Sequence, residues 1–253
     1  MGRILLPKKM EVVVASAGGV GTTFLINFIA QHRRVNHFDD EDGIKHLPVL
    51  PVSFNKELKL IYVYGNPQLA AMSLFRREYH HRQSKKLRKC VSNAPPAIAD
   101  SVTLEEYAAN GIDAFYFRDH FFNWYDTYLS SFPTLFLRYE TLFENVNPLF
   151  EFLDLPESCL HTFPEKKKRH SAIKEISADT RNGLDLMYGA FEQELAVMAD
   201  SEIRQGASTS LLSRFPLNSQ YLKSYGEQMY FESKECLRIH APHLYEYFRG
   251  LKK

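Results

Sequence analysis

The chain has 253 residues, of which 45% are hydrophobic and 24% charged, and its formal net charge is only +1. These values are typical of a globular protein with a large core, and the near-neutral balance excludes a general electrostatic attraction to nucleic acid. The three cysteines, Cys90, Cys159 and Cys236, are widely spaced, which argues against a disulfide framework and favours a reducing compartment. We find no signal peptide and no run of roughly 18 apolar residues. We therefore expect a cytoplasmic protein without membrane insertion.

A glycine-rich turn between an apolar strand and a helix is the most informative feature of the sequence. Residues 12–15 are apolar, residues 18–23 read GGVGTT, and a helical pattern resumes at Phe24. Backbone N–H groups at such a turn attract an anion, the helix dipole adds to the attraction, and glycines allow a close approach. We interpret this stretch as a phosphate-binding loop. A glycine turn without a ligand is the structural alternative.

Two related loop motifs can be compared with this turn. A Walker A loop requires glycine, four residues and then Gly-Lys-Ser/Thr, but Ser16 occupies the first position and Thr22 that of the lysine. The ParA/MinD variant, Lys-Gly-Gly-Val-Gly-Lys-Thr, is approached by residues 17–22 with both lysines missing. A nucleoside triphosphatase is therefore disfavoured, and a deviant P-loop nucleotidase remains an alternative.

Strand and helix patterns alternate after the loop. Strands are expected within residues 58–66 and 133–140, which are rich in residues that favour strands. Helices are expected at 67–79 beginning with Pro67, at 101–111 between a Ser101 or Thr103 cap and Gly111, at 113–132, and at 147–156.

This alternation, with continuous apolar strand cores, indicates a parallel sheet covered on both faces. We predict an α/β protein with three α/β/α layers, a central parallel sheet and a P-loop. Beyond Glu165 the sequence is polar and helical without a strong strand. We therefore expect one domain over 1–253, with an α/β core at 1–164 and a helical C-terminal extension at 165–253. That extension either forms a homodimer or covers the site.

A strongly basic run occupies residues 76–89. Its plain interpretation is a solvated face or a mobile loop, and its functional interpretation is an anion funnel or a grip on an acidic acceptor. The cationic residues of the run are Arg76, Arg77, Arg82, Lys85, Lys86, Arg88 and Lys89.

Four motifs in order resemble the sulfotransferase family that uses 3′-phosphoadenosine 5′-phosphosulfate (PAPS). The phosphosulfate loop of that family, Pro-Lys-Ser-Gly-Thr-Thr-Trp, is similar to GGVGTTF at 18–24, and its Lys-Thr-His-Leu-Pro is similar to KHLP at 45–48. Its strand followed by Arg-Asn-Pro and a later serine resembles IYVYGNPQLAAMSLF at 61–75. Its aromatic segment and Leu-Phe-x-Tyr-Glu resemble His120, Trp124 and the stretches LFLRYETL and EFLDLP. The resemblance covers about residues 11–156.

The resemblance implies a role for each matching residue. The loop would bind the 5′ phosphosulfate of PAPS, Phe24 would flank the adenine, Ser73 would bind the 3′-phosphate, and Tyr139 would belong to the nucleotide site. His46 would be the general base that deprotonates a hydroxyl or amine of the acceptor, and no metal is required. The loop residues are Gly18, Gly19, Val20, Gly21, Thr22 and Thr23.

Two cations of the family pattern are missing. Gly19 stands in place of the loop lysine, and Gly65 in place of the arginine that grips the 3′-phosphate. Because PAPS carries about four negative charges, replacements are needed. Arg77, or Arg76, lies on the face of Ser73 and is our hypothesis for the 3′-phosphate. Lys45 is the candidate on the sulfuryl side, and Arg169 or Arg181 could complete the 3′-phosphate site.

Several alternatives stay open at this stage. His37 and His120 are rivals of His46 as the base. The protein could also bind a nucleotide or another anion on a sulfotransferase fold without transferring a sulfuryl group, since both family cations are absent. The acceptor, for example a carbohydrate or a small molecule, would contact variable loops, here residues 31–43 and 84–112.

Overall fold

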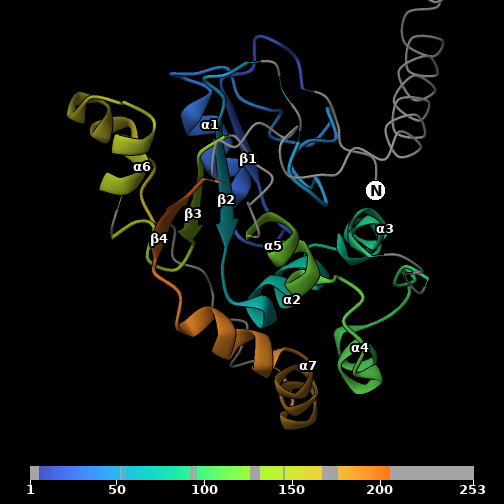
Figure 1. Cartoon of the computed structure of the whole chain (residues 1–253). Helices are drawn as coiled ribbons and strands as arrows, with labels where there is room; N and C mark the ends of the chain where they lie inside the picture. Colours follow the sequence, from blue (N-terminus) through green and yellow to red (C-terminus); the bar gives the residue numbers. More distant parts are fainter. Residues whose placement is uncertain are drawn as a thin grey trace, which may run out of the picture. The chain divides into compact units, whose positions relative to one another are not determined.

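A four-stranded sheet lies at the centre of the computed structural model (Figure 1). Its strands, in spatial order, are β1 (Val12–Ala15), β2 (Lys59–Tyr64), β3 (Thr134–Arg138) and β4 (Ser201–Arg204). The first three strands are parallel, and β4 runs antiparallel to β3. The structure describes residues 6–51, 53, 55–91, 94, 96–125, 132–144, 146–166 and 176–205.

The helices follow the strands in alternation, which confirms the predicted α/β class. The α-helices are α1 (Thr22–Ile29), α2 (Pro67–Arg76), α3 (His80–Leu87), α4 (Leu104–Asn110), α5 (Phe117–Tyr125), α6 (Asn147–Phe152) and α7 (Ala178–Ala196). Two short 3-10 helices, η1 (Arg88–Cys90) and η2 (Glu157–Thr162), complete the described elements.

The starts of α2 and α4 and the end of α4 lie where the local sequence predicts them. Asn66 caps α2 with its side chain, and Pro67 is the first helical residue. Thr103 and Glu106 form a reciprocal capping box at the start of α4, and Gly111 ends that helix in the left-handed conformation. These elements are specified locally, because the capping side chains and the backbone groups that they satisfy are only a few residues apart.

Aromatic side chains join α5 to one face of the sheet. The ring centroid of Tyr62 on β2 lies 5.4 Å from that of Trp124 on α5 and 5.6 Å from that of Phe136 on β3. On the other face, Phe28 of α1 packs against Phe150 of α6 at 5.6 Å. Helices therefore cover both faces of the sheet, as the continuous apolar strands require (Figure 1).

The segment after Glu165 differs from the prediction of helices alone, because it contributes β4 to the edge of the sheet. The polar sequence SEIR carries little strand signal of its own, and the strand forms by pairing with β3. Arg138 of β3 holds this segment in place, since its guanidinium donates to the carbonyl oxygens of Leu195 and Met198 at 2.5 and 3.0 Å.

The basic run contains the helix α3, whose cations Arg82, Lys85 and Lys86 are exposed. The predicted solvated face is therefore confirmed, and the alternative of a loop is wrong for residues 80–87. Helix α2 ends at Arg76, three residues before the predicted end, and α3 begins at His80. The chain turns between them at Glu78, which has a positive φ of 57°.

The described residues do not include 126–131 of the predicted helix at 113–132. They also do not include 167–175, which contains Arg169, or 206–253 of the expected extension. No helix in the described part of the chain has the length and apolar character needed to cross a membrane.

A buried polar cluster connects α4, α5 and α7. The hydroxyl of Tyr188 lies 2.6 Å from that of Tyr107 and donates to a carboxylate oxygen of Asp113 at 2.9 Å. The same carboxylate accepts the backbone N–H of Phe117 at the start of α5. Three elements therefore depend on one set of hydrogen bonds away from water.

We expect Tyr188→Phe to lower the free energy of unfolding by about 1–3 kcal/mol, because Tyr107 and Asp113 lose a buried partner. Urea unfolding measures this loss. Tyr116→Phe is the matched control, because the Tyr116 hydroxyl is also buried but has no partner among the described residues. Equal stability losses in the two variants would contradict the assigned role of the cluster.

Candidate active site

The glycine turn after β1 forms a tight loop that leads into α1. Gly18, Gly19 and Gly21 have positive φ angles of 103°, 76° and 70°, and Gly21 immediately precedes the helix. The loop backbone also lies directly against α2, since a Cβ atom at Gly19 would be 2.7 Å from the Cα and carbonyl oxygen of Ala70. The turn therefore requires glycine for conformation and, at Gly19, for space.

Hydrogen bonds from three segments fix the loop. Ser16 Oγ lies 2.6 Å from Thr22 Oγ1 and accepts the backbone N–H of Gly18 at 3.1 Å. Gln83 of α3 donates its side-chain amide to the carbonyl oxygen of Ala17 at 2.8 Å. The loop is thus held by its own hydroxyl groups and by a helix that the sequence motif does not include.

His46 lies beside this loop in a defined tautomer. Its Nδ1 is 2.7 Å from the carbonyl oxygen of Ser16, which can only accept a hydrogen bond, so Nδ1 carries the proton and Nε2 keeps its lone pair. Burial lowers the pKa of His46 to about 3, and nearby cations act in the same direction. The imidazole is therefore neutral at physiological pH.

Helix α5 supports the segment that carries His46. Trp124 donates its indole N–H to the carbonyl oxygen of Leu47 at 2.7 Å. His120, which is fully buried, lies 2.7 Å from the hydroxyl of Tyr62 through Nδ1, and burial lowers its pKa to about 3. His120 is not among the residues that line the cavity described next. It therefore belongs to the packing behind His46 and is a poor rival for the role of base.

A cavity of about 570 Å³ opens at the glycine loop, within the size range of small-ligand sites. It brings together most of the residues that the sequence predicts for the site. Its lining includes Gly18, Gly19, Gly21, Thr22, Thr23, Phe24, Lys45, His46 and Arg77, together with Phe38, Asp39, Asp40, Tyr79, Gln83 and Lys86.

Three cations, Lys45, Arg77 and Lys86, reach this cavity from three different segments. Lys45 donates through Nζ to Thr23 Oγ1 and to the carbonyl oxygen of Phe38, both at 2.7 Å. Burial lowers the pKa of Lys45, and the positive charges of Lys86 and Arg77 lower it further. The cavity therefore concentrates positive charge at the phosphate loop.

Asp40 partly balances this charge. Its side chain is only 4% exposed, forms an ion pair with Lys86, and accepts the backbone N–H of Lys45 at 2.9 Å. Sequence reasoning missed Lys86, Gln83 and Asp40 as site residues. The signal for Lys86 was its place in the basic run, but no local pattern indicates that residues 40 and 86 meet.

Other predicted residues lie near the cavity without lining it. Ser73 is one helical turn before Arg77, whose Nε donates to its carbonyl oxygen at 3.0 Å. Tyr139 packs against the loop, since a Cβ at Gly21 would lie 2.4 Å from its ring. Arg76 and Arg181 are exposed and line no part of the cavity. The roles assigned to these residues remain predictions, as does that of Val20, which is buried behind the loop.

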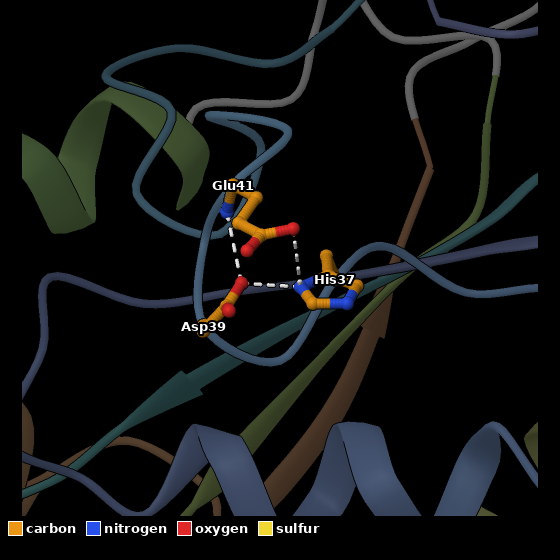
Figure 2. Close-up of side chains that lie close together, drawn as sticks. All are labelled: His37, Asp39 and Glu41. Carbon is orange, nitrogen blue, oxygen red and sulfur yellow. Dashed lines mark hydrogen bonds and ion pairs between the residues drawn. The ribbon is translucent and has the colours of Figure 1, made fainter.

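The rival base His37 lies on the loop that carries Asp39 and Glu41, and the three side chains face one another (Figure 2). A hydrogen bond with Asp39 raises the pKa of His37, so this imidazole favours its protonated form more than His46 does. One ligand atom from each of the three lies within 4.8 Å of the others. All three side chains are exposed, and nothing else in the described residues indicates a metal there.

Comparison with known proteins now identifies the family. The family model described as "Sulfotransferase domain" matches residues 44–188, which is more than half of the chain. The chain belongs to the sulfotransferase family. This sulfotransferase resembles, among solved structures, the mouse sulfotransferase SULT7A1 in its complex with PAP, with 15% sequence identity, a TM-score of 0.43, and coverage of 77% of this chain and 87% of the other. No curated protein matches the sequence.

The two glycines that stand in place of the family cations have different surroundings in this sulfotransferase. A side chain at Gly19 would collide with the backbone of α2. At Gly65, a Cβ would lie 2.8 Å from a carboxylate oxygen of Glu140, and that carboxylate also accepts the backbone N–H of Asn66 at 3.0 Å. The position of Gly19 is therefore closed by backbone atoms, whereas the atoms nearest to Gly65 belong to the end of the Glu140 side chain.

We expect Gly19→Ala to destabilise this sulfotransferase by about 1–3 kcal/mol more than Gly43→Ala, because of overpacking against α2. Gly43 is a matched control, since its φ of 67° is similar and a Cβ added there would meet no atom within 4 Å. The comparison separates conformational strain from steric conflict. Thermal or urea unfolding of both variants provides the measurement, and equal losses would exclude the predicted collision.

Acid should weaken the fold through His120. This residue stays neutral in the fold because burial lowers its pKa from 6.5 to about 3, so it takes up a proton only on unfolding. The contribution of neutral His120 to the free energy of unfolding is complete above pH 6.5 and is lost as the pH falls toward 3. Between pH 7 and 5 the free energy of unfolding therefore decreases by about 2 kcal/mol. Urea unfolding at these two pH values should show a smaller loss for His120→Gln than for the wild type. The same loss in both proteins would refute the assignment.

Proposed function

We propose that this sulfotransferase transfers the sulfuryl group of PAPS to a hydroxyl group, or to an amine, of its acceptor. The observation that carries the proposal is the cavity that unites the glycine loop with Lys45, His46 and Arg77. A loop for a phosphate, a neutral imidazole and two cations are the parts that sulfuryl transfer from a nucleotide requires.

The residues of the cavity fit a nucleotide with several negative charges. The N–H groups of Thr22 and Thr23 begin α1 and favour an anion, whereas that of Phe24 already donates to the carbonyl oxygen of Gly21 at 3.2 Å. On this ground we assign the phosphosulfate to residues 18–23. Lys45 donates a hydrogen bond to Thr23, next to the assigned position of the phosphosulfate. Arg77, next to Ser73, is assigned to the 3′-phosphate, Phe24 to the adenine and Tyr139 to the wall of the nucleotide site. Bound negative charge would raise the pKa of Lys45 and stabilise its protonated form.

His46 provides the proton acceptor in the proposed reaction. Its Nε2 takes the proton of the acceptor hydroxyl while the hydroxyl oxygen forms a bond to sulfur. The bond from sulfur to the phosphate oxygen breaks, and the electron pair leaves with adenosine 3′,5′-bisphosphate. The loop N–H groups and Lys45 stabilise the charge that develops on that phosphate. The hydrogen bond from Nδ1 to Ser16 keeps Nε2 available throughout.

A second candidate function is nucleotide or anion binding without transfer. The observation in its favour is Glu140, whose carboxylate lies beside Gly65 where the family pattern has a cation. One of its oxygens is buried without a partner in the described residues. A carboxylate at this place weakens the grip on a 3′-phosphate, so it favours a ligand that has no negative group there.

A thermal-shift titration distinguishes these functions. Adenosine 3′,5′-bisphosphate should raise the melting temperature, whereas ATP and GTP should not, and Arg77→Ala should weaken the bisphosphate affinity about tenfold. Unchanged affinity in Arg77→Ala would remove this residue from the proposed site. Stabilisation by ATP or GTP alone would support the deviant nucleotidase instead.

Transfer of labelled sulfate from PAPS then tests the role of His46. His46→Ala should retain affinity for the bisphosphate and lose at least about 100-fold in transfer rate. His161→Ala is the control, because His161 is an exposed histidine on η2 away from the cavity. Bisphosphate binding without transfer by the wild type, over a panel of hydroxyl acceptors, would favour the binding-only function.

A further inference from the structure

Strand β4 forms an edge of the sheet. It pairs with β3 on one side and is the last strand in the spatial order, so its other side has no neighbouring strand among the described residues (Figure 1). An edge strand presents backbone N–H and C=O groups that can pair with a further strand. Proteins commonly protect such an edge with charged side chains, proline or a covering segment. The side chains of β4 therefore decide which strand this edge can accept.

The backbone of Ile203, in the middle of this edge, points away from β3. The N–H of Arg138 donates to the carbonyl oxygen of Asp200 at 2.8 Å, and the register of the two strands places these residues opposite each other. Hydrogen-bonded and non-bonded pairs alternate along an antiparallel ladder. The backbone groups of Glu202 and Arg204 are therefore directed to β3, whereas the N–H and C=O of Ile203 are directed to the outer edge.

The side chain of Ile203 is a large apolar group on this edge. It is 58% exposed, although Leu135, its partner on β3, is fully buried. Side chains alternate between the two faces of a strand, and Tyr125 of α5 donates a hydrogen bond to Glu202, so Ile203 lies on the face opposite α5. The apolar layer of that face thus reaches the edge without a charged residue to end it. A strand with an apolar residue at the facing position would extend this layer.

Two partly exposed and opposite charges, Glu202 and Arg204, flank Ile203 on the other face. If two copies of β4 pair antiparallel with Ile203 at the centre, Glu202 of each copy lies directly opposite Arg204 of the other. Pairing centred on Ser201 would instead place Glu202 opposite Asp200, so that like charges face each other. Charge complementarity therefore favours a second copy of this chain as the occupant of the edge and Ile203 as the centre of the pairing.

We propose that β4 is a homodimer interface, in which the β4 strands of two copies pair antiparallel about a two-fold axis at Ile203. The N–H of Ile203 in each copy donates to the carbonyl oxygen of Ile203 in the other, because a hydrogen-bonded pair exchanges both bonds. The two isoleucine side chains lie together on the face opposite α5, and the two-fold symmetry forms the ion pair of Glu202 with Arg204 twice. One continuous sheet then runs through both copies. This inference does not depend on the proposed transfer reaction.

The test compares charge reversals in the full chain by sedimentation velocity. Because β4 is short, we expect a wild-type dissociation constant on the order of 10 µM, which is weak for a specific interface. Glu202→Arg and Arg204→Glu should each weaken dimerisation at least about tenfold, since each variant places like charges opposite each other twice. An equal mixture of the two variants should dimerise like the wild type, because every facing pair in the mixed dimer again has opposite charges.

Glu57→Arg and Lys56→Glu are the matched control pair. They change the net charge by the same amounts at exposed positions outside β4, so each should dimerise like the wild type. Urea unfolding verifies that every variant is folded, because Glu202 also accepts a hydrogen bond within its own chain.

A cysteine in the middle of β4 tests the pairing without changing either charge. Oxidation of Ile203→Cys by dissolved oxygen with a copper catalyst should link two copies at this position. The Cα atoms of a hydrogen-bonded antiparallel pair lie about 5.5 Å apart, which is within the range for a disulfide. Leu186→Cys is the control, because Leu186 is 89% exposed on α7 and should form covalent dimers only at a background level.

Restored dimerisation in the mixture, together with selective cross-linking at position 203, would support the proposal. A wild type that stays monomeric up to about 300 µM would overturn the homodimer. A mixture that stays monomeric, or an equal loss in the control pair, would overturn the pairing about Ile203. Equal cross-linking of Leu186→Cys and Ile203→Cys would overturn it as well, even if a charge reversal prevented folding.

Discussion

The contact between the glycine loop and α2 is the constraint on which the site depends. Because the backbone of Ala70 leaves no space for a side chain at Gly19, the loop can offer an anion its N–H groups but no lysine. Positive charge must then come from outside the loop. Lys45, Arg77 and Lys86 supply it from the segment after the first helix, from the end of α2 and from α3. The close contact at Gly19 is therefore the reason that the cations of this cavity come from other segments of the chain.

Ser16 supports both His46 and the glycine loop, through two different groups. The carbonyl oxygen of Ser16 fixes the tautomer of His46, and the hydroxyl of Ser16 holds Thr22. Trp124 fixes the segment from the other side through Leu47. These hydrogen bonds fix the position of the imidazole relative to the loop, and the proposed role of His46 as a general base would require such a fixed position.

The α/β class, the glycine loop and the ends of several helices could be predicted from the sequence, because these features depend on residues that are close together in the chain. Asn66 with Pro67 and Thr103 with Gly111 are examples. The sequence did not indicate α3, whose polar residues resemble a loop, or β4, which forms only by pairing with β3. The partnership of Asp40 with Lys86 joins residues far apart in the chain, so no local pattern could have shown it.

Lys86 forms an ion pair with Asp40 and lines two cavities, the one at the glycine loop and a second one of about 730 Å³ beside α3. An anion in either cavity would compete with Asp40 for the ammonium group of Lys86. An anion in one cavity would also weaken the attraction of this ammonium group for an anion in the other. By thermodynamic reciprocity, each ligand must alter the affinity of its neighbour by the same factor. A single ammonium group would thereby make anion binding in the two cavities interdependent without any movement of the sheet.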